Sequence, residues 1–165
     1  MDNSKFYWIK MENRMKYIIK SIKENDYEEA LELIWKSFLQ FDAQYCDDEG
    51  IKSYERDVIN NPMFIRMVQE ETNYIWGAYY QNRLCGVMVV RRTNHIMLLY
   101  VNSTMLRNGI GSALVNELKY SQHIITVNAS PFAVEFYKKL GFEVIDTKKN
   151  RHGIISIPMI LKLNK

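Results

Sequence analysis

A short run of apolar residues at 124–127, set between two helical patterns, restricts the fold more than any other feature. Residues 109–120 and residues 130–140 both repeat apolar side chains at helical spacing. A strand that is apolar along its length is typical of the centre of a sheet, where both faces are covered. The sequence therefore predicts a sheet with a buried central strand and helices packed against it.

The remaining patterns surround this unit with further helices and strands. Residues 27–38 carry an apolar stripe that predicts a helix, started by a capping-box-like pair, Asp26 and Glu29. An acidic loop is predicted over residues 42–50, a helix over 51–59 and a short helix up to residue 68. Strands are predicted at 15–22, 74–80, 84–91, 95–101, 142–145 and 154–163. This order predicts an α/β (α+β) fold in which helices pack on one mixed sheet.

Length and composition narrow the class of protein. The 165 residues suit one domain, which we expect to span residues 15–165 after an N-terminal arm of residues 1–14. The formal net charge of +3 argues against a nucleic-acid-binding protein, which usually carries a concentrated basic surface. No secretory signal and no apolar run of about 20 residues is present, so we expect no membrane association. Cys46 and Cys85 show no metal-ligand spacing with the histidines, which favours a reduced, cytoplasmic compartment and no metal.

The first segment with a pattern typical of ligand binding spans residues 98–114, where a strand is followed by a glycine-containing turn and a helix. Free amides and the positive end of a helix dipole bind anions, and glycine lets a phosphate approach the backbone. Close packing of the helix on the sheet explains Gly109 and Gly111 equally well. The segment lacks the Gly-Lys-Ser/Thr of a P-loop, and Leu114 replaces the third glycine of a dinucleotide fingerprint.

The second segment combines a strand, an asparagine and an aromatic helix. Asn128 follows the apolar strand, Ser130 is a favoured N-cap, and Pro131 suits the first helical position. Tyr137 falls on the apolar face of the predicted helix, and Gly141 is expected to end it. A buried tyrosine hydroxyl needs a polar partner, so Tyr137 is either a core residue or a functional one.

Together the two segments resemble the GNAT superfamily of N-acetyltransferases. The acetyl-CoA signature of that family, Gln/Arg-x-x-Gly-x-Gly/Ala, aligns with residues 106–111, where Leu106 replaces the usual Gln or Arg and Arg107 follows. The family's second signature matches Asn128, Phe136-Tyr137 and Leu140-Gly141-Phe142. The resemblance covers about residues 15–165 and implies a mixed, centrally splayed sheet flanked by helices.

The resemblance also implies where acetyl-CoA binds. The pantetheine arm would pair with the strand backbone, the pyrophosphate would bind the amides of the turn, and the thioester would lie where the strands part. Backbone amides at this gap would polarise the thioester carbonyl. The implied cofactor-binding residues are Leu99, Tyr100, Val101, Leu106, Arg107, Asn108, Gly109, Ile110, Gly111, Ser112, Asn128 and Tyr137.

The implied reaction is direct attack of a primary amine on the thioester in a ternary complex. Tyr137 occupies the general-acid position of the family and would protonate the leaving thiolate. His95 is the candidate base because imidazole titrates near neutrality, although a strand-end histidine is also explained by packing or exposure. An acidic group of residues would attract a cationic amine or simply form a solvated loop: Asp42, Asp47, Asp48 and Glu49. Tyr45 and Cys46 would contribute to the acceptor pocket.

The sequence leaves the acceptor open among polyamines, aminoglycosides, amino acids, ribosomal N-termini and lysine side chains. A slot closed by residues 42–50 would favour a small molecule, whereas an open groove would favour a peptide. The alternative function is a non-catalytic module that binds or senses acyl-CoA. A homodimer fits the resemblance, with the aromatic strand at 74–80 either at its interface or in the core.

Overall fold

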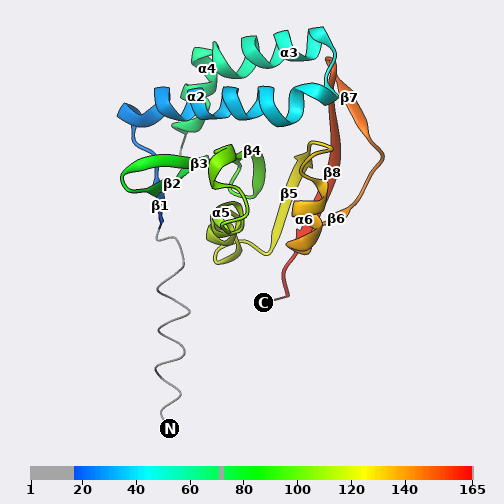
Figure 1. The fold of residues 1–165 in the computed structure, drawn as a ribbon. Helices are drawn as coiled ribbons and strands as arrows, with labels where there is room; N and C mark the ends of the chain where they lie inside the picture. Colours follow the sequence, from blue (N-terminus) through cyan, green and yellow to red (C-terminus); the bar gives the residue numbers. More distant parts are fainter. Residues whose placement is uncertain (1–16, 71–72, 165) are drawn as a thin grey trace.

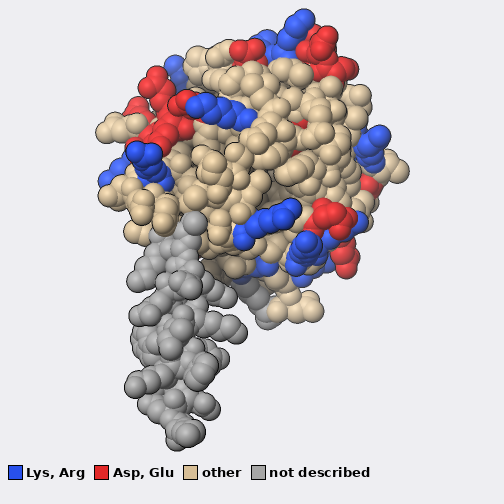
Figure 2. Space-filling model, in the orientation of Figure 1, with Lys and Arg blue, Asp and Glu red and all other residues tan. Residues whose placement is uncertain are grey.

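The computed structural model describes residues 17–70 and 73–164. The predicted arm at 1–14 lies outside the described residues, so the domain boundary at residue 15 stays a prediction. Within the described part of the chain, no helix combines the length and the apolar character needed to cross a lipid bilayer. Figure 2 shows Lys and Arg side chains interspersed with Asp and Glu on the face drawn, rather than gathered into one basic patch.

One mixed sheet organises the described residues (Figure 1). Along the sheet, the strands run in the order β1-β2-β3-β4-β5-β8-β6, with β7 paired to β8. Neighbouring strands are antiparallel except β4 and β5, which are parallel. The strands are β1 (Ile18–Ser21), β2 (Tyr74–Tyr80), β3 (Arg83–Arg91), β4 (His95–Val101), β5 (Ile124–Ala129), β6 (Glu143–Val144), β7 (Lys149–Arg151) and β8 (Ile154–Lys162).

The sheet opens between its two parallel strands. β4 and β5 pair only through residues 95–96 and 126–127. Beyond these residues, β4 continues to Val101 and β5 to Ala129 without pairing to each other. The predicted central splay is confirmed, and it places the opening at the carboxyl ends of both strands.

Helices cover both faces of the sheet, with α2, α3 and α4 together on one side and α5 on the other (Figure 1). Ten helical segments are assigned in the described residues. The α-helices are α2 (Tyr27–Ser37), α3 (Asp48–Tyr54), α4 (Pro62–Val68), α5 (Ile110–Lys119) and α6 (Val134–Lys139). Two π-helical turns, η2 (Phe38–Asp42) and η4 (Glu55–Ile59), extend α2 and α3. The short 3-10 turns are η1 (Glu24–Asp26), η3 (Ala43–Tyr45) and η5 (Ser103–Met105).

β3 separates two hydrophobic cores because its alternate side chains are buried on opposite faces. Val87 packs with α2 and α4, and Met88 packs with α5. The sequence predicts this double burial for residues 124–127, but Ile124 is 45% exposed and Ile125 is fully buried. The internal position of β5 is confirmed, whereas its burial on both faces is wrong because β5 contributes to the α5 core alone.

The predicted acidic loop at 42–50 is mostly helical. η2 and η3 carry the chain from α2 to residue 45, and α3 begins at Asp48. The Asp47 carboxylate caps α3 by accepting a 2.8 Å hydrogen bond from the Gly50 amide. Asp48 and Glu49 follow in the first turn, where acidic side chains complement the helix dipole. The acidic run is therefore a helix start, and the prediction of a loop is wrong.

The predicted start of the helix at residue 27 is confirmed, but its two predicted capping side chains make tertiary contacts instead. The helix start predicted at residue 130 is wrong. Asp26 accepts a 2.9 Å hydrogen bond from the Tyr79 hydroxyl, and Glu29 accepts one of 3.4 Å from the Leu84 amide, so neither caps α2. Ser130 lies in a turn before α6, which begins at Val134. The predicted end of that helix at residue 141 is confirmed, since the glycine there has a φ of 94°.

Candidate functional site

In the turn before α5, Gly109 and Gly111 have different structural roles. Gly109 caps the helix with a φ of 79°, a backbone conformation that favours glycine. A Cβ added to Gly111 would lie 3.1 Å from the ring of Phe136, which is tight packing between α5 and α6. The turn therefore explains Gly109, and close packing explains Gly111.

Backbone amides in this turn are available to an anion. The first main-chain hydrogen bond of α5 runs from the Ala113 amide to the Gly109 carbonyl, at 2.9 Å. Within the described part of the chain, the amides of residues 107–112 donate to no main-chain acceptor. Six neighbouring N–H groups at the positive end of a helix can donate hydrogen bonds to phosphate oxygens. These amides fit the pyrophosphate of coenzyme A.

A groove of about 620 Å³ runs from this turn to the end of β4. Most of the predicted cofactor residues line it: Leu99, Tyr100, Val101, Leu106, Arg107, Gly109, Ile110, Gly111 and Ser112. Asn108 does not line the groove, because its side chain turns back to donate hydrogen bonds to the carbonyls of Met105 and Leu106. Phe41 and Phe132, which the sequence analysis did not select, stack at the groove with ring centroids 4.8 Å apart.

A second cavity, of about 330 Å³, occupies the opening between β4 and β5. Asn128 and Tyr137 line this cavity rather than the groove. The two spaces share five lining residues: Asp42, Leu99, Tyr100, Ser130 and Ala133. The cavity and the groove therefore meet at the point where the parallel strands part.

A buried carboxylate with two tyrosines marks this junction. The Tyr100 hydroxyl donates a 2.8 Å hydrogen bond to Asp42 Oδ2, and the Tyr54 hydroxyl donates one of 3.3 Å to the Tyr100 hydroxyl. Asp42 is 9% exposed. Burial raises the pKa of its carboxyl, and hydrogen bonding to Ser130 and Tyr100 partly offsets that rise. Burial also raises the pKa values of both tyrosines, which keeps their hydroxyls protonated.

Tyr137 is buried among aromatic side chains. Its ring makes edge contacts with Phe136 and Phe142, each with centroids 5.1 Å apart. Among the described residues, its hydroxyl has no hydrogen-bond partner, and the side chain lines the cavity. Burial and then the charge of Asp42 raise the pKa of Tyr137. A protonated phenol thus lies at the cavity beside a buried carboxylate.

His95 lies apart from these groups. It begins β4 and pairs with Thr126, where its Nδ1 is 2.9 Å from the threonine hydroxyl. Tyr100 lies five positions further along the strand, a distance of about 16 Å. Burial and the charge of Arg91 lower the pKa of His95, and it lines neither the cavity nor the groove. The structure does not bring His95 together with the other predicted residues.

Asp42 alone among the predicted acidic residues reaches the cavity. Cys46 also lines it, but burial and the charge of Asp42 raise the pKa of the Cys46 thiol, which disfavours a nucleophilic role. A sequence signal for Asp42 exists: Ala30, Ile34 and Phe38 are buried at intervals of four residues, and position 42 continues that stripe. Within residues 17–70 and 73–164, no cluster of three His, Cys, Asp or Glu side chains suits a metal ion.

Comparisons with known proteins show the family of the chain. The family model described as "Acetyltransferase (GNAT) domain" matches residues 42–163, and the chain belongs to that family. No curated protein matches the chain.

Solved structures share the fold at low sequence identity. A GCN5-related N-acetyltransferase from Rhodopseudomonas palustris has a TM-score of 0.76 and 19% identity over 88% of this chain and 95% of its own. The PaiA N-acetyltransferase from Thermoplasma acidophilum, solved with coenzyme A, has a TM-score of 0.72 and 21% identity over 90% and 99%. An aminoglycoside 6′-N-acetyltransferase, also complexed with coenzyme A, has a TM-score of 0.58 and 15% identity over 90% and 98%.

Proposed function

We propose that the protein transfers an acetyl group from acetyl-CoA to a primary amine by direct attack within a ternary complex. The observation that carries this proposal is the junction of the groove and the cavity at Asp42, Tyr100 and Ser130. A donor in the groove and an acceptor in the cavity would meet only there. Holding the two reactants at one junction lowers the barrier by proximity and orientation.

The groove would hold the donor through the backbone. The amides of residues 107–112 would bind its pyrophosphate. From residue 97 onward, no strand of the described residues pairs with the edge of β4 that faces β5, so its backbone groups are available to the amides of pantetheine. Acetyl-CoA supplies the activated acetyl group as a thioester. Two of the structural neighbours described above were solved with coenzyme A, which supports this choice of donor.

Asp42 would accept the proton that the amine must lose. An alkylammonium ion has a pKa of about 10.4, so nearly all of the acceptor is protonated and unreactive at neutral pH. A buried carboxylate with a raised pKa is a better base than an exposed one. We assign the base to Asp42 because His95 lies outside the cavity, and Tyr100 would hold the carboxylate in place.

Tyr137 would donate a proton to the departing sulfur. The charge of Asp42 contributes to its raised pKa, so protonation of Asp42 by the amine makes Tyr137 more acidic when the sulfur leaves. The amine nitrogen forms a bond to the acetyl carbon, and the bond from that carbon to sulfur breaks. A second proton from nitrogen restores the phenol, and the proton held by Asp42 passes to solvent.

Two measurements test the proposal. Acetyl-CoA at 100 times its Kd should stabilise the protein by about 2.7 kcal/mol, which is measurable as a thermal shift. Release of free thiol from acetyl-CoA should depend on an added primary amine. Stabilisation without thiol release across a broad panel of amines would favour the non-catalytic acyl-CoA module. Absence of stabilisation would contradict both functions.

A further inference from the structure

The acceptor cavity has a different charge at each end. Its inner end, shared with the groove, carries the Asp42 carboxylate. Its outer end includes Asp57, Arg151 and His152. On β8, Ile154 pairs with Arg151 while Ile157 pairs with Ala129 near the junction, so the ends lie roughly 10 Å apart along the strand. Apolar side chains line the cavity as well: Val58, Met97, Leu98, Val127, Ala129, Ile154 and Ile155.

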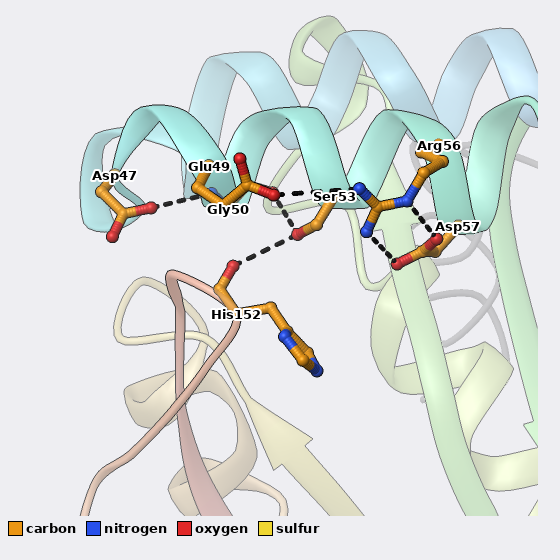
Figure 3. Close-up of polar contacts among 7 residues, drawn as sticks. All are labelled: Asp47, Glu49, Gly50, Ser53, Arg56, Asp57 and His152. Atoms are coloured by element: carbon orange, nitrogen blue, oxygen red, sulfur yellow. Dashed lines mark hydrogen bonds and ion pairs between the residues drawn. The ribbon is translucent and has the colours of Figure 1, made fainter.

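The outer end is fixed by contacts between the β7–β8 turn and α3 (Figure 3). The Ser53 hydroxyl donates a 3.2 Å hydrogen bond to the His152 carbonyl, and the Asp47 amide donates one of the same length to the Gly153 carbonyl. A Cβ on Gly50 would lie 2.4 Å from that Gly153 oxygen, so only glycine permits this approach. The backbone next to Arg151 is therefore held against the helix.

The charges at the outer end leave one cation without a partner. The Asp57 carboxylate is paired with Arg56 at 2.8 Å (Figure 3), and the charge of His152 also helps to lower its pKa. Lys149, two residues before Arg151, is paired with Asp146 at 2.6 Å. Within the described residues, Arg151 has no ion pair. A guanidinium group at a cavity wall binds carboxylate or phosphate oxygens well, because its fork of donors matches their geometry.

We propose that the acceptor is a small amino carboxylate whose ammonium group binds at Asp42 and whose carboxylate binds at Arg151, an inference that rests on the proposed function. The ammonium group offsets the burial of the Asp42 carboxylate, and Arg151 receives the partner that it lacks. The volume of about 330 Å³ lies at the lower end for ligand pockets and suits a small molecule rather than a peptide. A diamine would place its second positive charge against Arg151.

Three acceptors with the same carbon chain test the inference. With saturating acetyl-CoA, thiol release is measured for ω-aminohexanoate, n-hexylamine and hexanediamine. The expected order of kcat/KM is the amino carboxylate first and the diamine last. Because a hydrogen bond between charged groups is stronger than one between neutral groups, Arg151→Gln should lower kcat/KM for ω-aminohexanoate about tenfold or more. The same substitution should leave kcat/KM for n-hexylamine unchanged, because n-hexylamine has no carboxylate.

The matched control is Lys149→Gln, which removes the same charge from the same strand at a residue that does not line the cavity. It should leave the ratio between the three acceptors unchanged. Arg151→Glu should invert the order and favour hexanediamine. The inference is overturned if the three acceptors react equally, or if the Arg151 variants change all three by the same factor; n-hexylamine turnover would still support the proposed function.

Calorimetry separates this inference from the proposed function, since it needs no turnover. ω-Aminohexanoate is titrated into the protein saturated with coenzyme A. Binding that is weakened about tenfold or more by Arg151→Gln and retained by Lys149→Gln supports the acceptor site even if no amine releases thiol. Binding no tighter than that of n-hexylamine overturns it.

Discussion

The Tyr100 hydroxyl is 2.8 Å from Asp42 Oδ2, at the point where the groove and the cavity between β4 and β5 meet. Tyr100 comes from β4 beyond its last pair with β5, and Asp42 ends the π-helical turn after α2. The hydrogen bond thus joins the two layers of the fold directly above the opening in the sheet. Asp42 is therefore held at the opening that forms where β4 and β5 separate.

Replacing Asp42 with Asn should lower kcat by about 100-fold or more, because a positioned general base contributes about 10²–10⁴-fold. The amide keeps the shape of the side chain but accepts no proton from the amine. Stabilisation by acetyl-CoA should persist, since the amides of residues 107–112 are unchanged. The measurement is steady-state thiol release, with Glu49→Gln as a control that removes a nearby exposed charge. Wild-type turnover by Asp42→Asn would show that Asp42 is not the general base.

The same substitution should change how stability depends on pH. Burial raises the pKa of Asp42 in the folded protein above 3.8, so the folded state binds this proton more tightly than the unfolded state. The stabilisation that comes from protonated Asp42 is therefore fully present below its unfolded pKa of 3.8, and it is lost as the pH rises through the pKa of the folded state. Asp42→Asn should melt at a higher temperature than wild type at neutral pH, and the difference should vanish in acid. Thermal denaturation across this pH range measures it, and a destabilised variant at neutral pH would contradict it.

Tyr137→Phe should lower kcat by about 100-fold while the Kd for acetyl-CoA stays near that of wild type, because the variant lacks only the proton donor. Stability should change little, since the hydroxyl has no hydrogen-bond partner among the described residues. Tyr79→Phe is a useful contrast, because it breaks the hydrogen bond to Asp26 and lies outside both spaces. It should cost stability without changing kcat. Full turnover of Tyr137→Phe would show that this tyrosine is a core residue.

Local sequence signals predicted much of the fold. The strand and helix patterns and the glycine at 141 act over a few residues, so no distant contact is needed to read them. The capping roles predicted for Asp26 and Glu29 are wrong because both side chains bond to distant residues, and Ser130 lies in a turn before α6. The cofactor-binding role predicted for the glycine turn stays a prediction, although its residues line the groove, except for Asn108.

The lining of the cavity was harder to predict because it depends on the register between distant segments. His95 and Thr126 pair at the closed end of the parallel strands, and nothing near either residue in sequence fixes that register. Arg151 reaches the cavity only because the short β7 strand folds back on β8, and the sequence analysis did not predict β7. The burial of Asp42 could have been predicted, because position 42 continues the stripe of buried residues on α2.

The location of His95 gives a prediction of its own. His95→Gln keeps a polar group near Thr126, and the substituted residue lies outside both spaces. We expect kcat/KM for the acceptor to stay within about twofold of wild type, since no interaction with the reacting groups is removed. The pH profile of kcat/KM should also keep its acidic limb, which the proposed function assigns to Asp42. Loss of the acidic limb in His95→Gln would instead assign the role of general base to His95.

Gly109→Ala tests whether the turn before α5 binds the donor. The residue has a φ of 79°, so an alanine there costs about 1–2 kcal/mol or shifts the turn. A shifted turn would misalign the amides of residues 107–112, and the Kd for acetyl-CoA should rise by about tenfold or more. Gly141→Ala is the matched control because its φ is 94° and it lies away from the groove, so it should cost similar stability with an unchanged Kd. Equal effects of the two substitutions on acetyl-CoA binding would mean that strain, rather than loss of the amide site, weakens the complex.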